Sequence, residues 1–165
     1  MLLSDVRYSA WANRLLLDAC AALTAEEINR DLRISHANIL ATLSHIYDGE
    51  SVWLDRLRTR PEAGPWRLPM DPTPKLSLDE LRRRWPELWD GYRRLLEDSS
   101  EADFGVELPT QLPQSLEVLP WWKILRHMLD HSTLHRGQVV GMIRSLDHQP
   151  PAINRMDYFL VAEAS

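Results

Sequence analysis

The sequence is poor in the residues that mark secreted, fibrous and membrane proteins. Only one of its 165 residues is cysteine and only six are glycine. Because the single cysteine, Cys20, excludes an intrachain disulfide, we expect a protein of the reducing cytoplasm. The longest stretch without Asp, Glu, Lys or Arg has 14 residues, Ile34–Tyr47, whereas a membrane-spanning helix needs about 18. No basic segment followed by an apolar one opens the chain, so we expect no secretory signal.

The remaining composition is that of one ordinary globular domain. Hydrophobic residues make up 44% of the chain, charged residues make up 26%, and the mean hydropathy is −0.34. The length suits a single core, so we assign residues 1–165 to one domain. The net charge of −5 and the pI near 5.7 argue against general affinity for nucleic acid, which requires clustered positive charge. We therefore expect neither a nucleic-acid nor a membrane partner.

Apolar residues recur with the spacing of helices and not with the alternation of strands. Eleven prolines, most of them in two clusters, divide the chain into long stretches. We predict four long helices and a short terminal one, over Asp5–Leu23, Ser35–Arg60, Ser77–Asp98, Pro120–Leu146 and near Ile153–Ala162. Ser35 can cap the second helix, and Ser77 with Glu80 forms a capping signature for the third. The pattern predicts an all-α four-helix bundle with two long proline-rich connections, and it leaves the helix order open.

Three histidines recur at steps of four along the last long helix, at His127, His131 and His135. Each step of four residues turns about 400°, so the three side chains occupy one arc of the helix. His131 and His135 fall within the apolar stripe that a bundle helix turns to its core, and His127 lies at the edge of that stripe. Imidazoles in a core need partners for their ring nitrogens, because a buried nitrogen without one costs about 1–3 kcal/mol.

Two interpretations of His131 and His135 stay open. They form a hydrogen-bonded structural pair, or they bind one divalent metal ion, as paired histidines on one helix face do in helical zinc sites. A third ligand from another helix would favour the metal. His45 is the candidate, because an antiparallel pairing of the two helices places it at the same level, and its neighbours are small. His36 and His148 fall at the ends of elements and are expected at the surface.

Several other side chains receive interpretations from their positions alone. Cys20 lies among apolar helical residues and is expected to be a packed thiol. Asp130 and Arg136 lie off the histidine arc, so we expect them in salt bridges or at a dimer surface. Asp48 is either a base beside the site or an exposed charge. Four aromatic residues could line a pocket or belong to the core: Tyr8, Trp11, Trp53 and Trp122.

Three segments together resemble a known family. They are the histidine segment His127–Gln138 (HMLDHSTLHRGQ), the segment Leu43–Leu57 (LSHIYDGESVWLDRL) and the opening Tyr8–Leu16 (YSAWANRLL). The sequence is similar in these segments to the DinB / YfiT-like family of damage-inducible four-helix-bundle proteins. The resemblance covers nearly the whole chain, although residues 61–119 carry little of it.

The resemblance implies a bundle that binds one divalent ion, usually nickel or zinc, through three histidines, at positions that match His45, His131 and His135. It gives His127 a supporting role beside the ligands, or makes it a substitute ligand, and it implies a homodimer. Related proteins include thiol S-transferases and a thiol-dependent isomerase, which use small thiols such as bacillithiol or mycothiol. The implied function is a metal-dependent thiol S-transferase that acts on small electrophiles. The alternatives are a metal-dependent hydrolase and a non-enzymatic stress-response bundle that the metal stabilises.

Overall fold

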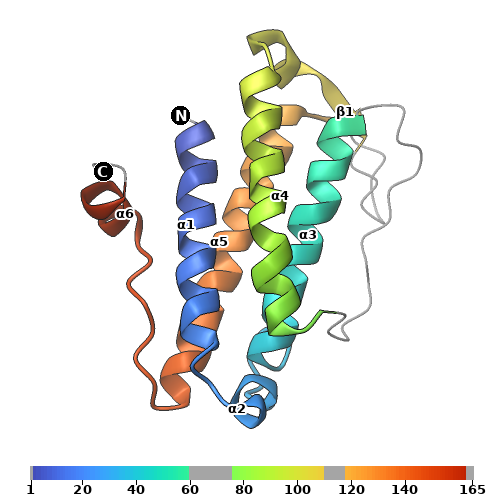
Figure 1. The fold of residues 1–165 in the computed structure, drawn as a ribbon. Helices are drawn as coiled ribbons and strands as arrows, with labels where there is room; N and C mark the ends of the chain where they lie inside the picture. The colour runs from blue at the N-terminus through green and yellow to red at the C-terminus, as the bar shows by residue number, and fades with distance from the viewer. Residues whose placement is uncertain (1, 60–75, 110–117, 163–165) are drawn as a thin grey trace.

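A computed structural model of the chain describes residues 2–59, 76–109 and 118–162. Four long helices form a bundle, as predicted (Figure 1). They are α1 (Leu2–Cys20), α3 (Ile39–Thr59), α4 (Leu78–Asp98) and α5 (Trp121–Ser145). The shorter elements are α2 (Ala25–Asn29), the 3-10 helix η2 (Glu101–Gly105), β1 (Glu107–Pro109), β2 (Val118–Pro120) and α6 (Arg155–Val161). Among the described helices, none combines the length and the low polarity needed to cross a membrane.

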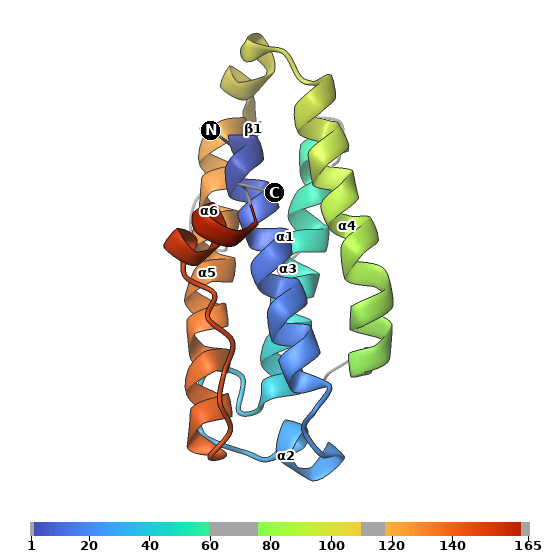
Figure 2. The same cartoon turned by 60° about the vertical axis from the view of Figure 1, so that its left-hand side comes forward.

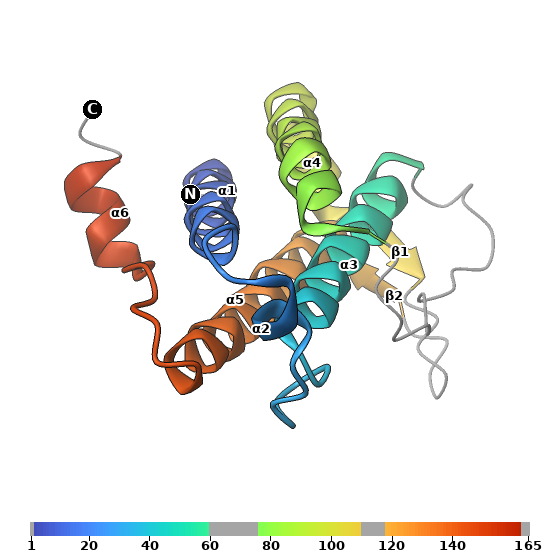
Figure 3. The same cartoon turned by 60° about the horizontal axis from the view of Figure 1, so that its bottom comes forward.

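The four long helices form a ring in which α1 and α3 each pack against both α4 and α5. Seen from below in Figure 3, α1 and α4 make one side of the bundle, and α3 and α5 make the opposite side. Helices α3 and α4 run in the same direction, while α1 and α5 run in the other (Figure 1). The bundle is therefore not a simple up-down-up-down arrangement, which the sequence had left open.

The apolar stripes meet in one core between the helices. On α4 the predicted stripe is buried at Leu81, Trp85 and Tyr92. Cys20 is fully buried, and burial raises the pKa of its thiol to about 12. The prediction of a packed thiol is confirmed.

Several predicted element boundaries are wrong. Helix α3 begins at Ile39, because Ser35 has a φ of 53°, in the left-handed region, and cannot be the N-cap. Asn38 takes that role, and its Oδ1 accepts a hydrogen bond from the backbone N–H of Ala41. The cap at Ser77 is confirmed, since its hydroxyl accepts from the N–H of Glu80 and the Glu80 carboxylate accepts from the N–H of Ser77.

Four small elements were not predicted: α2, η2, β1 and β2. Helix α2 has its own capping box, made by Thr24 and Glu27, which ends the first long helix earlier than expected. Strands β1 and β2 pair antiparallel and correct the expectation of no strands. Both prolines within the pair, Pro109 and Pro120, lie at strand ends, where the missing N–H costs least. Most of the two proline-rich connections lies outside the described residues.

Helix α6 lies across the outside of α1 (Figure 2). The Tyr8 hydroxyl donates to the carbonyl of Ile153 at 2.8 Å, and Asp5 pairs with Arg155. Tyr158 packs its ring against Tyr8, with ring centroids 5.8 Å apart. These contacts confirm the predicted terminal helix and fix its place on the bundle.

Candidate metal centre

Helices α3 and α5 bring the three predicted metal ligands together. His45 lies in the second turn of α3, and His131 and His135 lie one turn apart in α5. The Nε2 atoms of His45 and His131 are 3.1 Å apart, and those of His131 and His135 are 3.2 Å apart. The antiparallel course of α3 and α5 produces this convergence, since it places the two histidine positions at one level.

Gly49, one turn beyond His45, helps the two helices to approach each other. A Cβ atom added there would lie 3.7 Å from Cε1 of His131, which is ordinary contact. The imidazole of His131 therefore lies directly over the bare backbone of α3. The small residues noted around His45 in the sequence do leave space, and His131 fills part of it.

The nitrogen spacing fits a shared cation. Two nitrogen ligands at about 2.0–2.1 Å from a tetrahedral ion lie about 3.3 Å apart. The two Nε2 separations at His131 are close to this value. A neutral imidazole has one N–H, so the Nε2 atom of His131 can donate to only one of its two neighbours. A cation satisfies all three nitrogens at once.

The orientation of His135 favours the same conclusion. Its Nδ1 atom lies 2.6 Å from Oε1 of Gln138, an oxygen that accepts a hydrogen bond. The proton of the ring therefore lies on Nδ1, and Nε2 has a free lone pair turned to His131. Metal-binding histidines commonly donate their other N–H to such an oxygen, which fixes the tautomer and the ring orientation.

A fourth histidine lies beside the three. His36 precedes α3, and its ring stacks on His45 with centroids 3.8 Å apart and an interplanar angle of 29°. One ring nitrogen each of His36, His45 and His135 lies within 4.8 Å of the others. His36 was expected at the surface, and it is half-buried there, in the turn before α3. His148 is at the surface as expected, where it pairs with Glu27 at 2.8 Å.

Electrostatics favour the neutral form of His36, His45 and His131. Burial first, and then the neighbouring imidazoles, lower the pKa of His45 and of His131 to about 4. The same two causes lower the pKa of His36. Neutral imidazole is the form that binds metal, so these side chains are ready to act as ligands near pH 7.

His127 lies farther from the cluster. Its ring centroid is 6.0 Å from that of His131 and 5.9 Å from that of Trp53. A supporting role for His127 stays a prediction. Of the four aromatic residues proposed for a pocket, Trp53 is the one that this contact places near the histidines. Tyr8 packs beneath α6, and Trp122 is 46% exposed.

A buried polar cluster lies next to the histidines and joins all four long helices. Glu50 of α3 accepts hydrogen bonds from Asn13 of α1, Trp85 of α4 and Ser132 of α5. Ser132 directly follows His131 in the chain. Burial raises the pKa of Glu50 to about 7, although these donors and Arg136 oppose the shift.

Arg136 completes this cluster and corrects a prediction. It was expected in a salt bridge or at a dimer surface, but it is only 1% exposed, and it donates hydrogen bonds to uncharged side chains. Its guanidinium donates to Asn13 Oδ1 at 3.2 Å, Ser9 Oγ at 3.3 Å and Thr133 Oγ1 at 2.8 Å. The error arose because α5 buries a second face against α1. The polar residues Ser9 and Asn13 lie within the apolar stripe of α1. They could have indicated that a buried polar side chain packs against that helix. Asp130 pairs with Arg126 at the surface, as expected.

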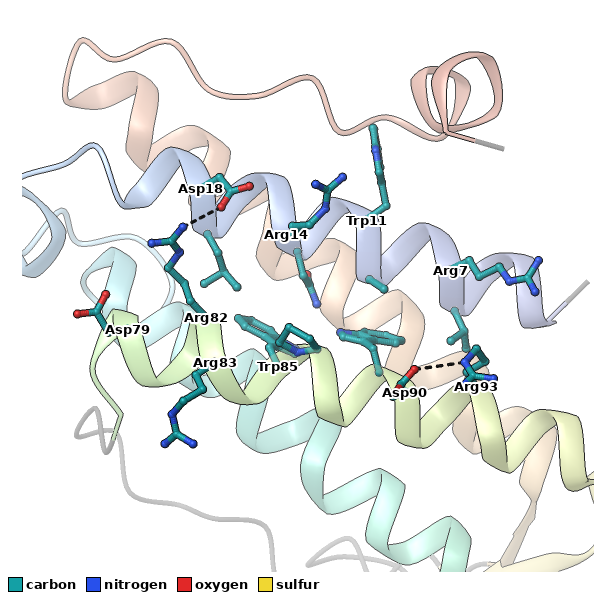
Figure 4. Close-up of a pocket in the computed structure, with 16 residues that line it drawn as sticks. Arg7, Trp11, Arg14, Asp18, Asp79, Arg82, Arg83, Trp85, Asp90 and Arg93 are labelled. Carbon is teal, nitrogen blue, oxygen red and sulfur yellow. Dashed lines mark hydrogen bonds and ion pairs between the residues drawn. The ribbon is translucent and has the colours of Figure 1, made fainter. Parts of the chain in front are cut away.

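A groove of about 690 Å³ lies on the opposite side of the bundle, between α1 and α4 (Figure 4). Tryptophans and arginines are among the residues that line it, including Trp11, Trp85, Arg7 and Arg14. Figure 4 shows Arg82 of α4 reaching Asp18 of α1 across one end. Trp85 and Asn13 line the groove and also donate to Glu50, so hydrogen bonds connect the groove to this buried carboxylate.

Comparisons with known proteins agree with this geometry. The model of the DinB family matches residues 1–163. Protein DinB of Bacillus subtilis (strain 168) is 21% identical over 141 residues, which cover 83% of this chain and 81% of that protein. With its helical bundle and a histidine cluster that could hold a metal ion, the chain belongs to the DinB family.

Proposed function

We propose that the chain binds one divalent transition-metal ion through His45, His131 and His135. The observation that carries this proposal is the convergence of three Nε2 atoms with separations of 3.1 and 3.2 Å at His131. Imidazole suits zinc and nickel, the two ions that we expect here. Three protein ligands leave a coordination position free, as catalytic metal sites do, whereas structural zinc sites close with four.

We further propose that this site activates a low-molecular-weight thiol for transfer to a small electrophile. A divalent ion held there would lower the pKa of a bound thiol and make it nucleophilic at neutral pH. In the transfer the thiol loses its proton to solvent and its sulfur bonds to the electrophilic carbon. The leaving group departs with the electron pair of the bond that breaks.

The burial of Cys20, the chain's own thiol, supports the proposal that the nucleophile is a thiol from outside the chain. Cys20 is fully buried, and burial raises its pKa to about 12, so it is a poor nucleophile at neutral pH. The side chains that carry the three Nε2 atoms are imidazoles, which would bind and orient but not attack. The resemblance also predicts a homodimer, which light scattering during size-exclusion chromatography tests.

The first experiment measures metal. Wild-type protein purified without added chelator should contain about one equivalent of metal by elemental analysis, and His131→Ala should contain almost none. His148→Ala is the matched control, because His148 pairs with Glu27 away from the cluster and its loss should leave the metal content unchanged. If His131→Ala retains the metal, the ligand assignment is wrong.

The second experiment separates the functions. With 2-mercaptoethanol and monobromobimane, which loses bromide on S-alkylation, the transferase should form the thioether faster than the buffer does, and chelation should abolish the difference. Turnover of ester or amide substrates without any thiol would indicate the hydrolase instead. A metal that stabilises the fold but whose spectrum no thiol perturbs would indicate the non-enzymatic bundle.

A further inference from the structure

The segment between α2 and α3, residues 30–38, has an unusual backbone. Arg33, Ser35 and Ala37 have φ angles of 56°, 53° and 72°, and none of them is glycine. The left-handed region is strained for residues that have a side chain. The backbone N–H of Leu32 donates to the carbonyl of Ala37 at 2.7 Å and closes the segment into a tight turn. Strain of this kind persists where the surroundings fix it, and it is typical of functional sites.

The strained segment holds His36 beside the three imidazoles of the helices. His36 lies between two of the positive-φ residues, and its ring stacks on His45 at 3.8 Å. Its centroid is 5.5 Å from that of His135. The hydroxyl of Ser35 lies 3.1 Å from Nδ1 of His135, so the segment contacts α5 at the cluster as well.

The distances place His36 at the border of a coordination sphere. Its nearest ring nitrogen lies within 4.8 Å of those of His45 and His135, against about 3.3 Å between two ligands of a tetrahedral ion. The structure shows the ring stacked on His45. The nitrogens of His36, His45 and His135 are nevertheless close enough together for the three side chains to share one ion.

We propose that His36 is an exchangeable fourth ligand, which closes the metal site at rest and returns to the stack on His45 when a thiol binds. This inference rests on the proposed metal site. Rigid helices hold the other three ligands, whereas His36 is held by a short strained segment, so it is the ligand that can leave with the least rearrangement. In the exchange a sulfur–metal bond replaces a nitrogen–metal bond, and the proton of the thiol goes to solvent.

The test uses the cobalt-substituted full chain and 2-mercaptoethanol as the probe. Wild-type protein should show the intense visible bands of four-coordinate cobalt. His36→Ala should still bind one equivalent, with weaker bands of higher coordination number and about tenfold weaker affinity for cobalt, as expected when one support of a metal site is lost. The thiol should bind about tenfold more tightly to His36→Ala, because no imidazole has to be displaced.

Two further variants isolate the ligand role. His36→Phe keeps an aromatic ring for the stack on His45 but has no donor nitrogen, so it should behave like His36→Ala. His148→Ala should behave like the wild type. Identical spectra and thiol affinities for wild type, His36→Ala and His36→Phe would overturn the role of His36 and leave a three-histidine site. Complete loss of metal from folded His36→Phe would show an obligatory ligand and overturn the exchange. Failure of the wild type to bind cobalt would overturn the proposed function itself.

Discussion

Glu50 shows how a single buried carboxylate affects this protein. Burial raises its pKa to about 7 in the folded state, above the value of an exposed glutamate. The folded state then holds a proton that the unfolded state has released, so stability due to this group falls as pH rises from about 4.5 to 7.

Comparison with Glu50→Gln tests this sign. Urea unfolding of both proteins with EDTA, at pH 5 and pH 7.5, gives the difference in their free energies of unfolding. We expect the stability of Glu50→Gln relative to the wild type to be greater at pH 7.5 than at pH 5, because glutamine has no proton to lose. The histidines are common to both proteins and cancel. A difference that does not change with pH would contradict the raised pKa.

Cys20 provides a second prediction. A fully buried thiol with a pKa of about 12 should not react with Ellman's reagent in the native protein near pH 8. One thiol should react promptly after unfolding in urea, which is the control. Prompt reaction of the native protein would show that α1 opens readily around Cys20.

The individual site residues were predictable to different degrees. His131 and His135 were placed together by their spacing within one helix, and His45 by the expected antiparallel pairing. His36 was not predictable, because its position depends on a strained segment that has no glycine to signal it. The burial of Arg136 was missed because helix periodicity identifies one apolar stripe of α5. It does not show that the face carrying Arg136 packs against α1.

Helix α5 contains two glycines whose replacement should stabilise the protein. A Cβ added at Gly137 or Gly141 meets no heavy atom within 4 Å. Each change to alanine should therefore raise the free energy of unfolding by up to about 1 kcal/mol, the difference in helix propensity. Metal content should not change in either variant.

Gly91 of α4 is the contrasting case. An added Cβ would lie 2.6 Å from Nη2 of Arg58 and 2.7 Å from Cδ2 of Leu54. Although alanine favours a helix, Gly91→Ala should lower the free energy of unfolding, because both α3 side chains must move. Urea unfolding of the three variants side by side checks the order, and a stabilised Gly91→Ala would contradict the close packing of α3 on α4.

Among the elements, the long helices were predictable and their ends were not. Apolar spacing over twenty residues identifies a helix regardless of its neighbours, and the cap at Ser77 depends only on local residues. The start of α3 depends instead on the turn around His36, and the pairing of β1 with β2 depends on segments joined across the bundle end. These contacts join separate segments of the chain, so no local sequence pattern predicts them.

At the scale of the whole molecule, the proposed metal would join two helices that are far apart in the sequence. His45 and His131 are 86 residues apart in sequence, so the unfolded chain lacks the preformed site. Added zinc should therefore raise the melting temperature, by an amount equivalent to about 2.7 kcal/mol at a concentration of 100 times Kd.

Differential scanning fluorimetry with zinc, and then with excess EDTA, measures this effect. EDTA should reverse the shift, and His45→Ala should show little shift at any zinc concentration. Equal shifts in His45→Ala and wild type would place the stabilising ion elsewhere.

The hydrogen bonds that run from the groove to Glu50 have a practical consequence for engineering. Arg7 and Trp11 line the groove between α1 and α4 without any hydrogen bond to Glu50, so this face is the side on which a new binding surface could be built. Asn13 and Trp85 line the same groove but donate to Glu50, which in turn accepts from the residue next to His131. A redesign that replaces either of them would remove a hydrogen-bond donor from Glu50, which is only 1% exposed.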